Sequence, residues 1–359
     1  MTKRIAIIGG GYIGVTLAKS LEDKADVTLI EPSSHFVHTP AMIRAVVDPG
    51  ILDRALMPYD RLLTKGTLVR ARAASVDAEG IALEDGRRVE ADYIVVATGS
   101  QNATPFKPKG ADIAGLRADN ADIHARVKAA STIAIVGAGA VGTELAGEIA
   151  HAMPDKTITL VSSDPTLFPQ NPGKLGQSLA RKLKAAGVDL VLGTTAENLE
   201  SLTEPYSGTL DLADGRSVSA DLIFPAIGSR ASSEILESLP GARKGSANRI
   251  VADPWMRPSS LKNVLAAGDV AEMGDAMTIV AASRQLTWLK KAFGALIEGK
   301  DLDAVQPYKP WTNPPILVPL GPQKGSSFLS LFTAGDFLTR QMKGKDLFLT
   351  RYEKLLRQA

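Results

Sequence analysis

Short apolar runs and amphipathic stretches alternate along the first 31 residues of the chain. Residues 3–9 form a β-rich run that ends in glycine, and the residues up to about Leu21 place Leu17 and Leu21 on one helical face. A second short apolar run, residues 26–31, follows and ends on Glu31. This order of strand, helix and strand predicts a βαβ unit.

The same pattern recurs 128 residues further along, where Gly137 takes the place of Gly9. A strand from residue 132, a helix over 142–151 and a strand over 157–163 rebuild the unit. Each copy continues into a hairpin-like segment with an Asp-Gly turn, and each ends in a buried run closed by glycine, "VVATGS" and "FPAIGSR". The repeat therefore covers whole domains.

The last third of the chain follows a different pattern. Residues 263–273, "NVLAAGDVAEM", contain a buried strand, and a helix is expected from about 277 to 297. Residues 306–325 hold too many prolines and glycines for a continuous helix, and a short β-like stretch over 326–333 follows. A final helix is expected over 345–358. Its apolar residues follow i, i+4, i+7, i+8 spacing: Phe348, Tyr352, Leu355 and Leu356.

These elements predict an α/β protein with two Rossmann-like dinucleotide-binding domains and a small C-terminal α+β domain. The first domain is discontinuous and is expected to comprise residues 1–118 and 249–305. Residues 119–248 form the second domain, and residues 306–359 form the C-terminal domain with its terminal amphipathic helix.

Composition narrows the function classes. A formal net charge of +2 lacks the basic excess of nucleic-acid-binding proteins, so no nucleic acid is expected as a partner. The chain has no cysteine, which excludes redox mechanisms built on a thiol pair, and its four histidines predict no metal site. No apolar run approaches the roughly 18 residues of a membrane span. The N-terminus has no signal peptide, and Thr2 replaces the glycine that myristoylation needs, so a cytoplasmic location is expected.

The first glycine-rich turn has the spacing of a dinucleotide-binding loop. Gly9 permits a tight turn, Gly11 lets the backbone approach a pyrophosphate, and Gly14 allows close packing of helix on strand. The helix that follows presents free N–H groups to phosphates. Glu31 lies 22 residues after Gly9, where an acid accepts hydrogen bonds from a ribose.

The second turn repeats this cradle with Gly137, Gly139 and Gly142, but Ser162 takes the place of Glu31. A carboxylate there would favour NADH, and a neighbouring arginine would favour NADPH. Neither is present, so the choice between NADH and NADPH stays open.

Gly268 and Asp269 place one carboxylate at the end of a buried strand, beside the start of a helix. Asp269 could cap that helix. Beside two nucleotide-binding units, a polyhydroxyl chain such as ribityl is the preferred partner.

The two glycine loops, "VVATGS" and "AAGDV" together resemble the flavoproteins with two dinucleotide-binding domains. The chain is more closely similar to the apoptosis-inducing-factor family, in its ferroptosis suppressor branch, through "HFVHTPAMIRAVVDPG", "PYKP" and "KGKDLFLTRYEKLLRQ". This resemblance covers nearly the whole chain. It implies FAD on the first domain and NAD(P)H on the second. The chain lacks the large C-terminal insertion of the longer family members.

The resemblance also implies which residues form the sites. It places Glu144 and Glu148, which lie on one helix face, near the nicotinamide as catalytic candidates. The alternative for this pair is a solvated acidic face. The cofactor-binding candidates are Gly9, Gly10, Gly11, Tyr12, Ile13, Gly14, Glu31, Pro32, Arg44, Ala73, Ala97, Thr98, Gly99, Gly137, Gly139, Ala140, Val141, Gly142, Ser162, Gly228, Gly268 and Asp269.

By this resemblance, the chain is expected to be an FAD-dependent NAD(P)H oxidoreductase that passes electrons to a quinone-type acceptor. The lack of cysteine excludes activities like those of glutathione reductase and sulfide:quinone reductase. A type II NADH dehydrogenase, a ferredoxin or rubredoxin reductase, and an NADH-dependent redox sensor are the alternatives. The oligomeric state stays open.

The predicted final helix combines its apolar residues with several basic ones, among them Lys343, Lys345, Arg351, Lys354 and Arg357. That combination suits a helix lying on an anionic membrane surface. A helix docked on its own protein, or on a second subunit, fits the pattern equally well.

Overall fold

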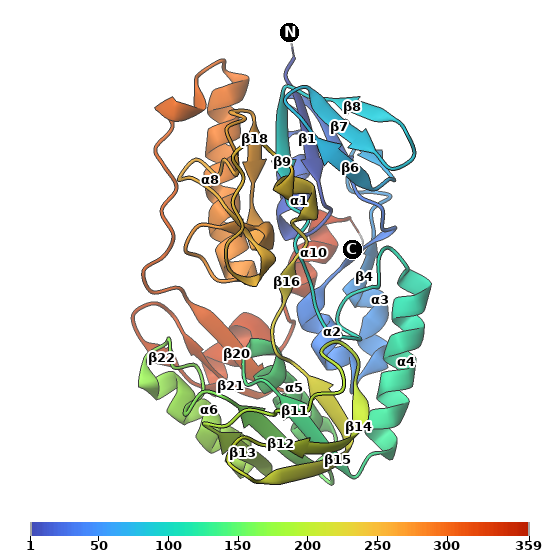
Figure 1. Ribbon diagram of the computed structural model, residues 1–359, viewed down its shortest axis with the longest axis vertical. Helices are drawn as coiled ribbons and strands as arrows, with labels where there is room; N and C mark the ends of the chain where they lie inside the picture. Colours follow the sequence, from blue (N-terminus) through green and yellow to red (C-terminus); the bar gives the residue numbers. More distant parts are fainter. Residues whose placement is uncertain (1, 358–359) are drawn as a thin grey trace.

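The computed structural model describes residues 2–357 and contains two five-stranded sheets at opposite ends of an elongated molecule (Figure 1). All neighbours in the first sheet are parallel. The strands of the first sheet are, in spatial order, β18 (Val264–Ala266), β9 (Tyr93–Val96), β1 (Arg4–Ile8), β2 (Asp26–Ile30) and β5 (Thr67–Val69). Strand β18 joins from far along the sequence, so this domain is built from two separate stretches of chain.

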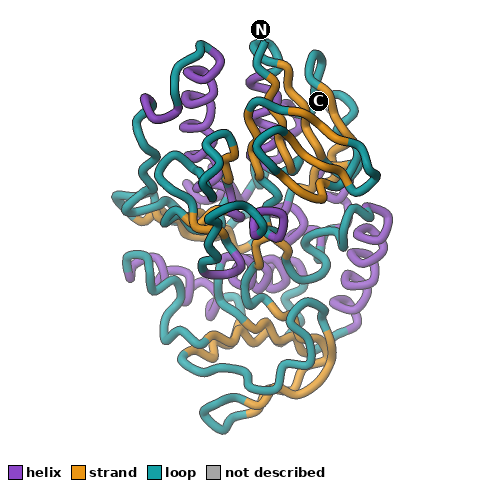
Figure 2. Tube along the Cα trace, turned by 45° about the horizontal axis from the view of Figure 1, so that its top comes forward, coloured by secondary structure: helices purple, strands orange, loops and turns teal. Residues whose placement is uncertain are grey.

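The second sheet repeats the parallel arrangement and adds one antiparallel strand at its edge. Its order is β13 (Val188–Leu192), β12 (Thr157–Ser162), β11 (Thr132–Val136), β15 (Ser217–Pro225) and β14 (Tyr206–Asp211). Figure 2 shows the two groups of strands, one near the N-terminus and one at the far end, with helices and loops between them. The predicted α/β fold is confirmed.

Small sheets and ten α-helices complete the described chain. Three two-stranded sheets pair β3 (His35–Val37) with β4 (Leu56–Pro58), β10 (Ser100–Gln101) with β16 (Arg230–Ala231), and β17 (Ile250–Val251) with β19 (Ala271–Glu272). A three-stranded sheet consists of β6 (Ala73–Val76), β7 (Gly80–Leu83) and β8 (Arg88–Glu90), in that order. The α-helices of residues 2–357 are α1 (Tyr12–Leu21), α2 (Thr39–Ala45), α3 (Leu52–Ala55), α4 (Ile113–Ala129), α5 (Ala140–Ala152), α6 (Gly173–Ala185), α7 (Glu234–Glu237), α8 (Ile279–Ile297), α9 (Asp336–Thr339) and α10 (Leu349–Leu355). Within that range, no helix is long and apolar enough to cross a bilayer.

The central strands of the first sheet are mainly apolar because both faces of the sheet are covered, one by helices and the other by the β6–β8 sheet and α7. Ile5 and Ile7 of β1 are buried, and α1 packs Leu17 onto the same core as Leu29 of β2. Helix α8 lies against α1, which joins the late segment of the chain to the first domain.

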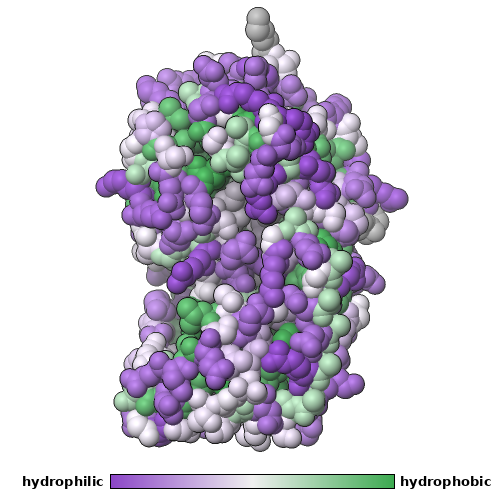
Figure 3. All heavy atoms as spheres, turned by 45° about the vertical axis from the view of Figure 1, so that its right-hand side comes forward, coloured by the Kyte–Doolittle hydropathy of each residue, from purple (hydrophilic) through white to green (hydrophobic). Residues whose placement is uncertain are grey.

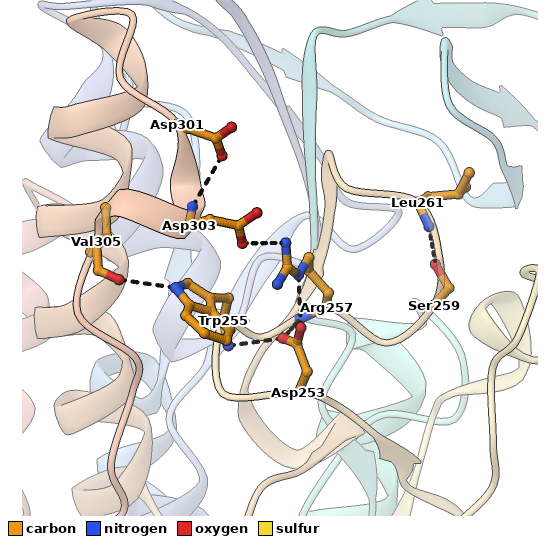
Figure 4. Close-up of polar contacts among 8 residues, drawn as sticks. All are labelled: Asp253, Trp255, Arg257, Ser259, Leu261, Asp301, Asp303 and Val305. Carbon is orange, nitrogen blue, oxygen red and sulfur yellow. Dashed lines mark hydrogen bonds and ion pairs between the residues drawn. The ribbon is translucent and has the colours of Figure 1, made fainter.

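A compact loop secures the return of the chain to the first domain (Figure 4). The Asp253 carboxylate accepts hydrogen bonds from the backbone N–H groups of Trp255 and Arg257, and also pairs with the Arg257 guanidinium. Arg257 reaches on to Asp303 at 2.7 Å, and the Trp255 indole donates to the carbonyl of Val305. These contacts tie the loop to the turn after α8.

The C-terminal domain differs in detail from the sequence-based expectation. Its sheet has the strand order β20 (Ile316–Leu320), β21 (Lys324–Phe328) and β22 (Thr333–Ala334), so one strand lies in the Pro-rich segment. The predicted β-like stretch over 326–333 covers only the end of β21, the turn after it and the first residue of β22. The predicted helix over 345–358 is wrong in extent. A π-helical turn spans Arg340–Gly344, and only Leu349–Leu355 is α-helical, because Phe348 adopts a left-handed backbone with φ of 66°. The last predicted helical residue, Gln358, lies outside the described residues.

Candidate functional site

A cavity of about 810 Å³ lies where the two large domains and the C-terminal domain meet. Its wall begins at the first glycine loop, passes Asp269 and the start of α8, and reaches β20 and Lys343. Figure 3 shows the molecular surface hollowed where the upper and lower halves meet. This volume is in the range of cavities that hold small ligands and cofactors.

The first glycine loop is shaped by contacts that leave no room for side chains on its inner side. A Cβ at Gly9 would lie 2.4 Å from the carbonyl oxygen of Ala97, and a Cβ at Gly14 would lie 1.8 Å from the carbonyl oxygen of Gly9. At Gly11 the opposite holds, because no heavy atom of the other described residues approaches within 4 Å of a Cβ. Gly11 thus presents bare backbone to the cavity, as a pyrophosphate requires.

Two side chains hold this loop in position. Glu31 accepts the backbone N–H of Gly10 at 2.6 Å with one carboxylate oxygen and the N–H of Ser33 at 2.7 Å with the other. The Tyr59 hydroxyl donates to the carbonyl of Gly10 at 2.7 Å. Each Glu31 oxygen keeps a lone pair for a ribose hydroxyl, so the predicted role of Glu31 fits its position in the cavity wall.

The second glycine loop has the same geometry. A Cβ at Gly137 would lie 2.3 Å from the carbonyl of Ala226 and one at Gly142 would lie 1.9 Å from that of Gly137, whereas Gly139 has open space. Ser162 is buried, and its hydroxyl accepts the backbone N–H of Asp164 at 3.2 Å. The second loop can therefore also receive a pyrophosphate against bare backbone.

Asp269 faces the cavity at the end of β18, as the sequence predicted. Its carboxylate accepts a hydrogen bond from the Ser100 hydroxyl at 2.6 Å, and the backbone N–H of Gly268 donates to the Gln285 side chain at 2.7 Å. Lys107, which the sequence analysis did not single out, donates to the carbonyl of Ser100 at 2.5 Å. Burial lowers the pKa of Lys107. Polar groups fitted to a polyhydroxyl chain and a phosphate thus gather on this wall.

Of the two predicted acids on α5, Glu144 lines the cavity. Its carboxylate lies 2.6 Å from the ammonium of Lys343, which also donates to the carbonyl of Leu317 at 3.2 Å. Burial raises the pKa of Glu144. The alternative of a solvated acidic face is wrong, since Glu144 and Glu148 are both buried.

Glu148 lies one turn further along α5 and pairs with Arg44 of α2. The Arg44 guanidinium donates to the Glu148 carboxylate at 2.9 to 3.1 Å and to the carbonyl of Gly344 at 2.8 Å. Both side chains are more than nine-tenths buried. This pair joins all three domains, and neither residue is among those described as lining the cavity.

The predicted amphipathic face of the C-terminal helix is covered by the protein itself. Tyr352 is buried, and its ring packs against those of Tyr12, Phe36 and His38 at centroid distances of 5.1 to 5.3 Å. The His38 ring nitrogen Nε2 lies 2.5 Å from the carbonyl of Leu347, and Nδ1 lies 3.3 Å from the Tyr12 hydroxyl. In the structure this helix therefore docks on its own chain, and its buried apolar residues do not face a membrane surface.

We expect His38 to make stability depend on pH below neutrality. Burial lowers the pKa of His38 from 6.5 to about 4, so the unfolded chain takes up a proton at higher pH than the native chain. The free energy of unfolding is therefore expected to fall by about 3 kcal/mol as the pH is lowered from 6.5 to 4, because the unfolded chain binds a proton that native His38 does not. Urea unfolding of wild type and His38→Phe at a series of pH values measures it. Equal pH dependence in the two proteins would contradict the assignment.

The structure brings most of the predicted FAD residues to the cavity wall and leaves the predicted nucleotide residues of the second domain mainly outside it. The predicted residues that line the cavity are Gly9, Gly10, Gly11, Tyr12, Ile13, Glu31, Pro32, Ala73, Ala97, Thr98, Gly99, Ala140, Val141, Glu144, Gly268 and Asp269. Those found elsewhere in the described chain are Gly14, Arg44, Gly137, Gly139, Gly142, Glu148, Ser162 and Gly228. Their roles stay predictions.

Three basic residues of the cavity wall were missed as site residues. They are Arg72, Lys107 and Lys343. Lys107 lies in an irregular Pro-rich loop, and Lys343 appeared in the sequence only as one of several basic residues near the C-terminus. Neither residue has a fixed spacing to a glycine motif, so no local signal distinguishes them.

Comparison with known proteins agrees with this geometry. The pyridine nucleotide-disulphide oxidoreductase family matches residues 4–50 and 59–285. Apoptosis-inducing factor homolog B of Dictyostelium discoideum is 31% identical over 98% of this chain and 96% of its own length. Human ferroptosis suppressor protein 1 is 25% identical over 99% of this chain and 96% of its own.

Solved structures show the same fold. The sulfide:quinone oxidoreductase of Aquifex aeolicus has a TM-score of 0.78 at 16% identity, covering 99% of this chain and 92% of that one. NDH2 from Plasmodium falciparum in complex with NADH has a TM-score of 0.76 at 14% identity, covering 98% and 97%. With its two glycine cradles and its relatives of nearly equal length, the chain belongs to the pyridine nucleotide-disulphide oxidoreductase family, and its cofactors are FAD and NAD(P)H.

Proposed function

We propose that the chain is an FAD-dependent NAD(P)H:quinone oxidoreductase. FAD, when bound, takes a hydride from NAD(P)H and passes two electrons to the acceptor. With a quinone, one NADH, one proton and one quinone give one NAD⁺ and one hydroquinone. The residues of the chain must therefore hold two nucleotides, admit a flat apolar acceptor and supply a proton.

The apolar part of the cavity wall is the observation that favours a quinone as the acceptor. The start of α8, the start of β20 and the residues just before them contribute Met277, Ile279, Val280, Ala282, Pro315, Ile316 and Leu317 to it. The chain has no cysteine that could relay electrons to a disulfide or a persulfide. An acceptor that enters this cavity directly and packs against apolar side chains fits both observations.

Lys343 and Glu144 supply the proton chemistry in this proposal. The Lys343 ammonium lies 2.6 Å from the Glu144 carboxylate and within the cavity wall, where its positive charge favours negative charge on a bound group. Because burial raises the pKa of Glu144, this carboxyl group can also hold and return a proton. The tight Arg44–Glu148 pair leaves Glu148 as a residue that positions α5.

Lys343→Met is expected to lower kcat with a soluble short-chain quinone by about 10²-fold, the range of general acid–base groups. FAD content, measured by absorbance, should stay at wild-type level, since the glycine cradle is untouched. Lys354→Met is the matched control, because Lys354 is exposed on α10 and outside the cavity wall. Unchanged kcat in Lys343→Met would remove this residue from the mechanism.

Steady-state oxidation of NADH and NADPH by the purified flavoprotein, with a soluble quinone, oxygen or a ferredoxin, tests the proposed function. Turnover that is fastest with the quinone supports it. Flavin reduction without turnover would identify a redox sensor, and turnover with ferredoxin alone would identify a ferredoxin reductase. Either result would overturn the quinone assignment.

A further inference from the structure

The first glycine cradle shows which residues flank the ribose of a bound nucleotide. The backbone N–H of Gly9 donates to the carbonyl of Ile30 at 2.9 Å, and the Glu31 carboxylate accepts the N–H of Ser33 at 2.7 Å. Glu31 and Ser33 both line the cavity. In a dinucleotide-binding unit the adenosine ribose lies at this end of the second strand. The residue that follows the strand and the residue two positions later therefore lie beside the ribose.

The second cradle has the same turn with different side chains. The N–H of Gly137 donates to the carbonyl of Val161 at 2.8 Å, and the Ser162 hydroxyl accepts the N–H of Asp164 at 3.2 Å. Asp164 thus takes the place of Ser33, beside the ribose of the second nucleotide. Ser162 is buried and holds the turn. The acid that the first cradle has directly after its strand therefore lies two residues later in the second.

Strand β13, which lies beside β12 (Figure 1), fixes the other side of this turn. The N–H of Gly193 donates to the carbonyl of Asp164 at 3.0 Å, and the N–H of Thr194 donates to that of Ser162 at 3.1 Å. The Asp164 side chain is exposed, and within residues 2–357 it takes part in no ion pair. An unmatched negative charge therefore lies at the carboxyl end of the second sheet.

The chain segments around this charge offer no free positive side chain. Residues 157–173, which form β12 and the turn after it, contain no lysine, arginine or histidine, and neither do residues 188–200, which form β13 and the loop after it. An isolated bridge joins this loop to the hairpin that carries Arg216. The Arg216 guanidinium is already paired with Asp214 at 2.6 Å. A phosphate group on the ribose would thus meet Asp164 without a compensating cation from these described segments.

We propose that the second cradle selects NADH over NADPH, and that Asp164 is the residue that separates the two. The nucleotides differ in a single group, the 2′-hydroxyl or 2′-phosphate of the adenosine ribose. A carboxylate accepts a hydrogen bond from the hydroxyl, whereas it repels the phosphate. This inference names the electron donor of the proposed function and rests on that function for its role.

Reduction of the bound flavin by each nucleotide, followed by stopped flow without an acceptor, tests the proposal on the full-length flavoprotein. The second-order rate constant of wild type should be at least about tenfold higher with NADH than with NADPH. Asp164→Asn should raise the rate constant for NADPH and leave that for NADH nearly unchanged, because asparagine removes the repulsion and keeps a hydrogen-bonding group. Asp155→Asn is the matched control. It makes the same change of charge just before β12, at the opposite edge of the sheet, and should behave as wild type.

Binding to the oxidised flavoprotein isolates the 2′ group from the redox reaction. Calorimetry with ADP-ribose and with 2′-phospho-ADP-ribose should give at least about tenfold tighter binding of ADP-ribose in wild type. Asp164→Asn should remove most of this difference, and Asp164→Arg should reverse it, since a guanidinium binds the phosphate.

Two results would overturn the assignment. The first is equal or faster flavin reduction by NADPH in wild type, and the second is a preference for NADH that persists in Asp164→Asn. Neither measurement uses an electron acceptor. Normal reduction by NADH followed by no turnover with a quinone would contradict the proposed function and leave the selection of NADH in place, so the two failures are distinguishable.

Discussion

Replacing Arg44 by methionine is expected to lower the free energy of unfolding by about 3–5 kcal/mol, because the substitution leaves the Glu148 carboxylate buried without its partner. The pair is more than nine-tenths buried, and Arg44 also donates to the carbonyl of Gly344 in the C-terminal domain. Urea unfolding of the purified flavoprotein, followed by tryptophan fluorescence and circular dichroism, measures the change.

Two further variants define what this loss means. Arg44→Met/Glu148→Leu should recover much of the stability, since no unpaired charge then remains in the interior. Arg54→Met is the matched control, because Arg54 also bridges to the C-terminal domain, through Glu353 at 2.6 Å, but is half exposed. It should cost about 1 kcal/mol or less. If Arg44→Met folds normally and instead loses FAD, Arg44 is the cofactor contact that the resemblance implied.

Valine at Gly11 is expected to prevent the binding of FAD, and valine at Gly139 is expected to weaken the binding of NADH. Both glycines have extended backbone, with φ of −76° and −68°, and open space where a Cβ would point, so valine can be accommodated by the fold. In each loop the new side chain occupies the place of a pyrophosphate. Gly11→Val should be purified without FAD. Gly139→Val should retain FAD and weaken NADH binding by about 10²-fold or more.

Absorbance at the flavin maximum and stopped-flow reduction by NADH separate the two variants. Gly9 and Gly137 would be poor substitutes as probes, because their φ values of 104° and 109° and their close carbonyl contacts mean that any side chain strains the loop itself. Retention of FAD in Gly11→Val, or normal reduction by NADH in Gly139→Val, would show that the two cradles do not divide the nucleotides in this way.

Both loops were recognisable in the sequence because the features that define them are local. Strand periodicity and the glycine spacing, and in the first unit also the acid after the second strand, lie within about 30 consecutive residues. The same holds for "AAGDV", whose aspartate the structure places in the cavity wall beside the first loop. The fold class followed from these units, since two βαβ units with matching hairpins predict two parallel sheets.

The C-terminal domain shows where local patterns were insufficient. The apolar spacing of Phe348, Tyr352, Leu355 and Leu356 fits a helix on a membrane and a helix on a protein equally well. Burial of Tyr352 among the rings of Tyr12, Phe36 and His38 decided between them, and those partners lie more than 300 residues away. The left-handed backbone at Phe348 has no signature in the sequence either, because phenylalanine is not a residue type that favours positive φ.

The sequence by itself determined the two nucleotide cradles, the α/β fold and the absence of thiol chemistry, because glycine spacing, periodicity and composition are properties of the chain alone. Only the tertiary structure decided how the acids of α5 are used. Glu144 meets Lys343 across 199 residues and lines the cavity, whereas Glu148 meets Arg44 across 104 residues and joins the domains. A side chain's partner depends on which distant segments the folded chain brings within hydrogen-bond distance, and no local pattern encodes that.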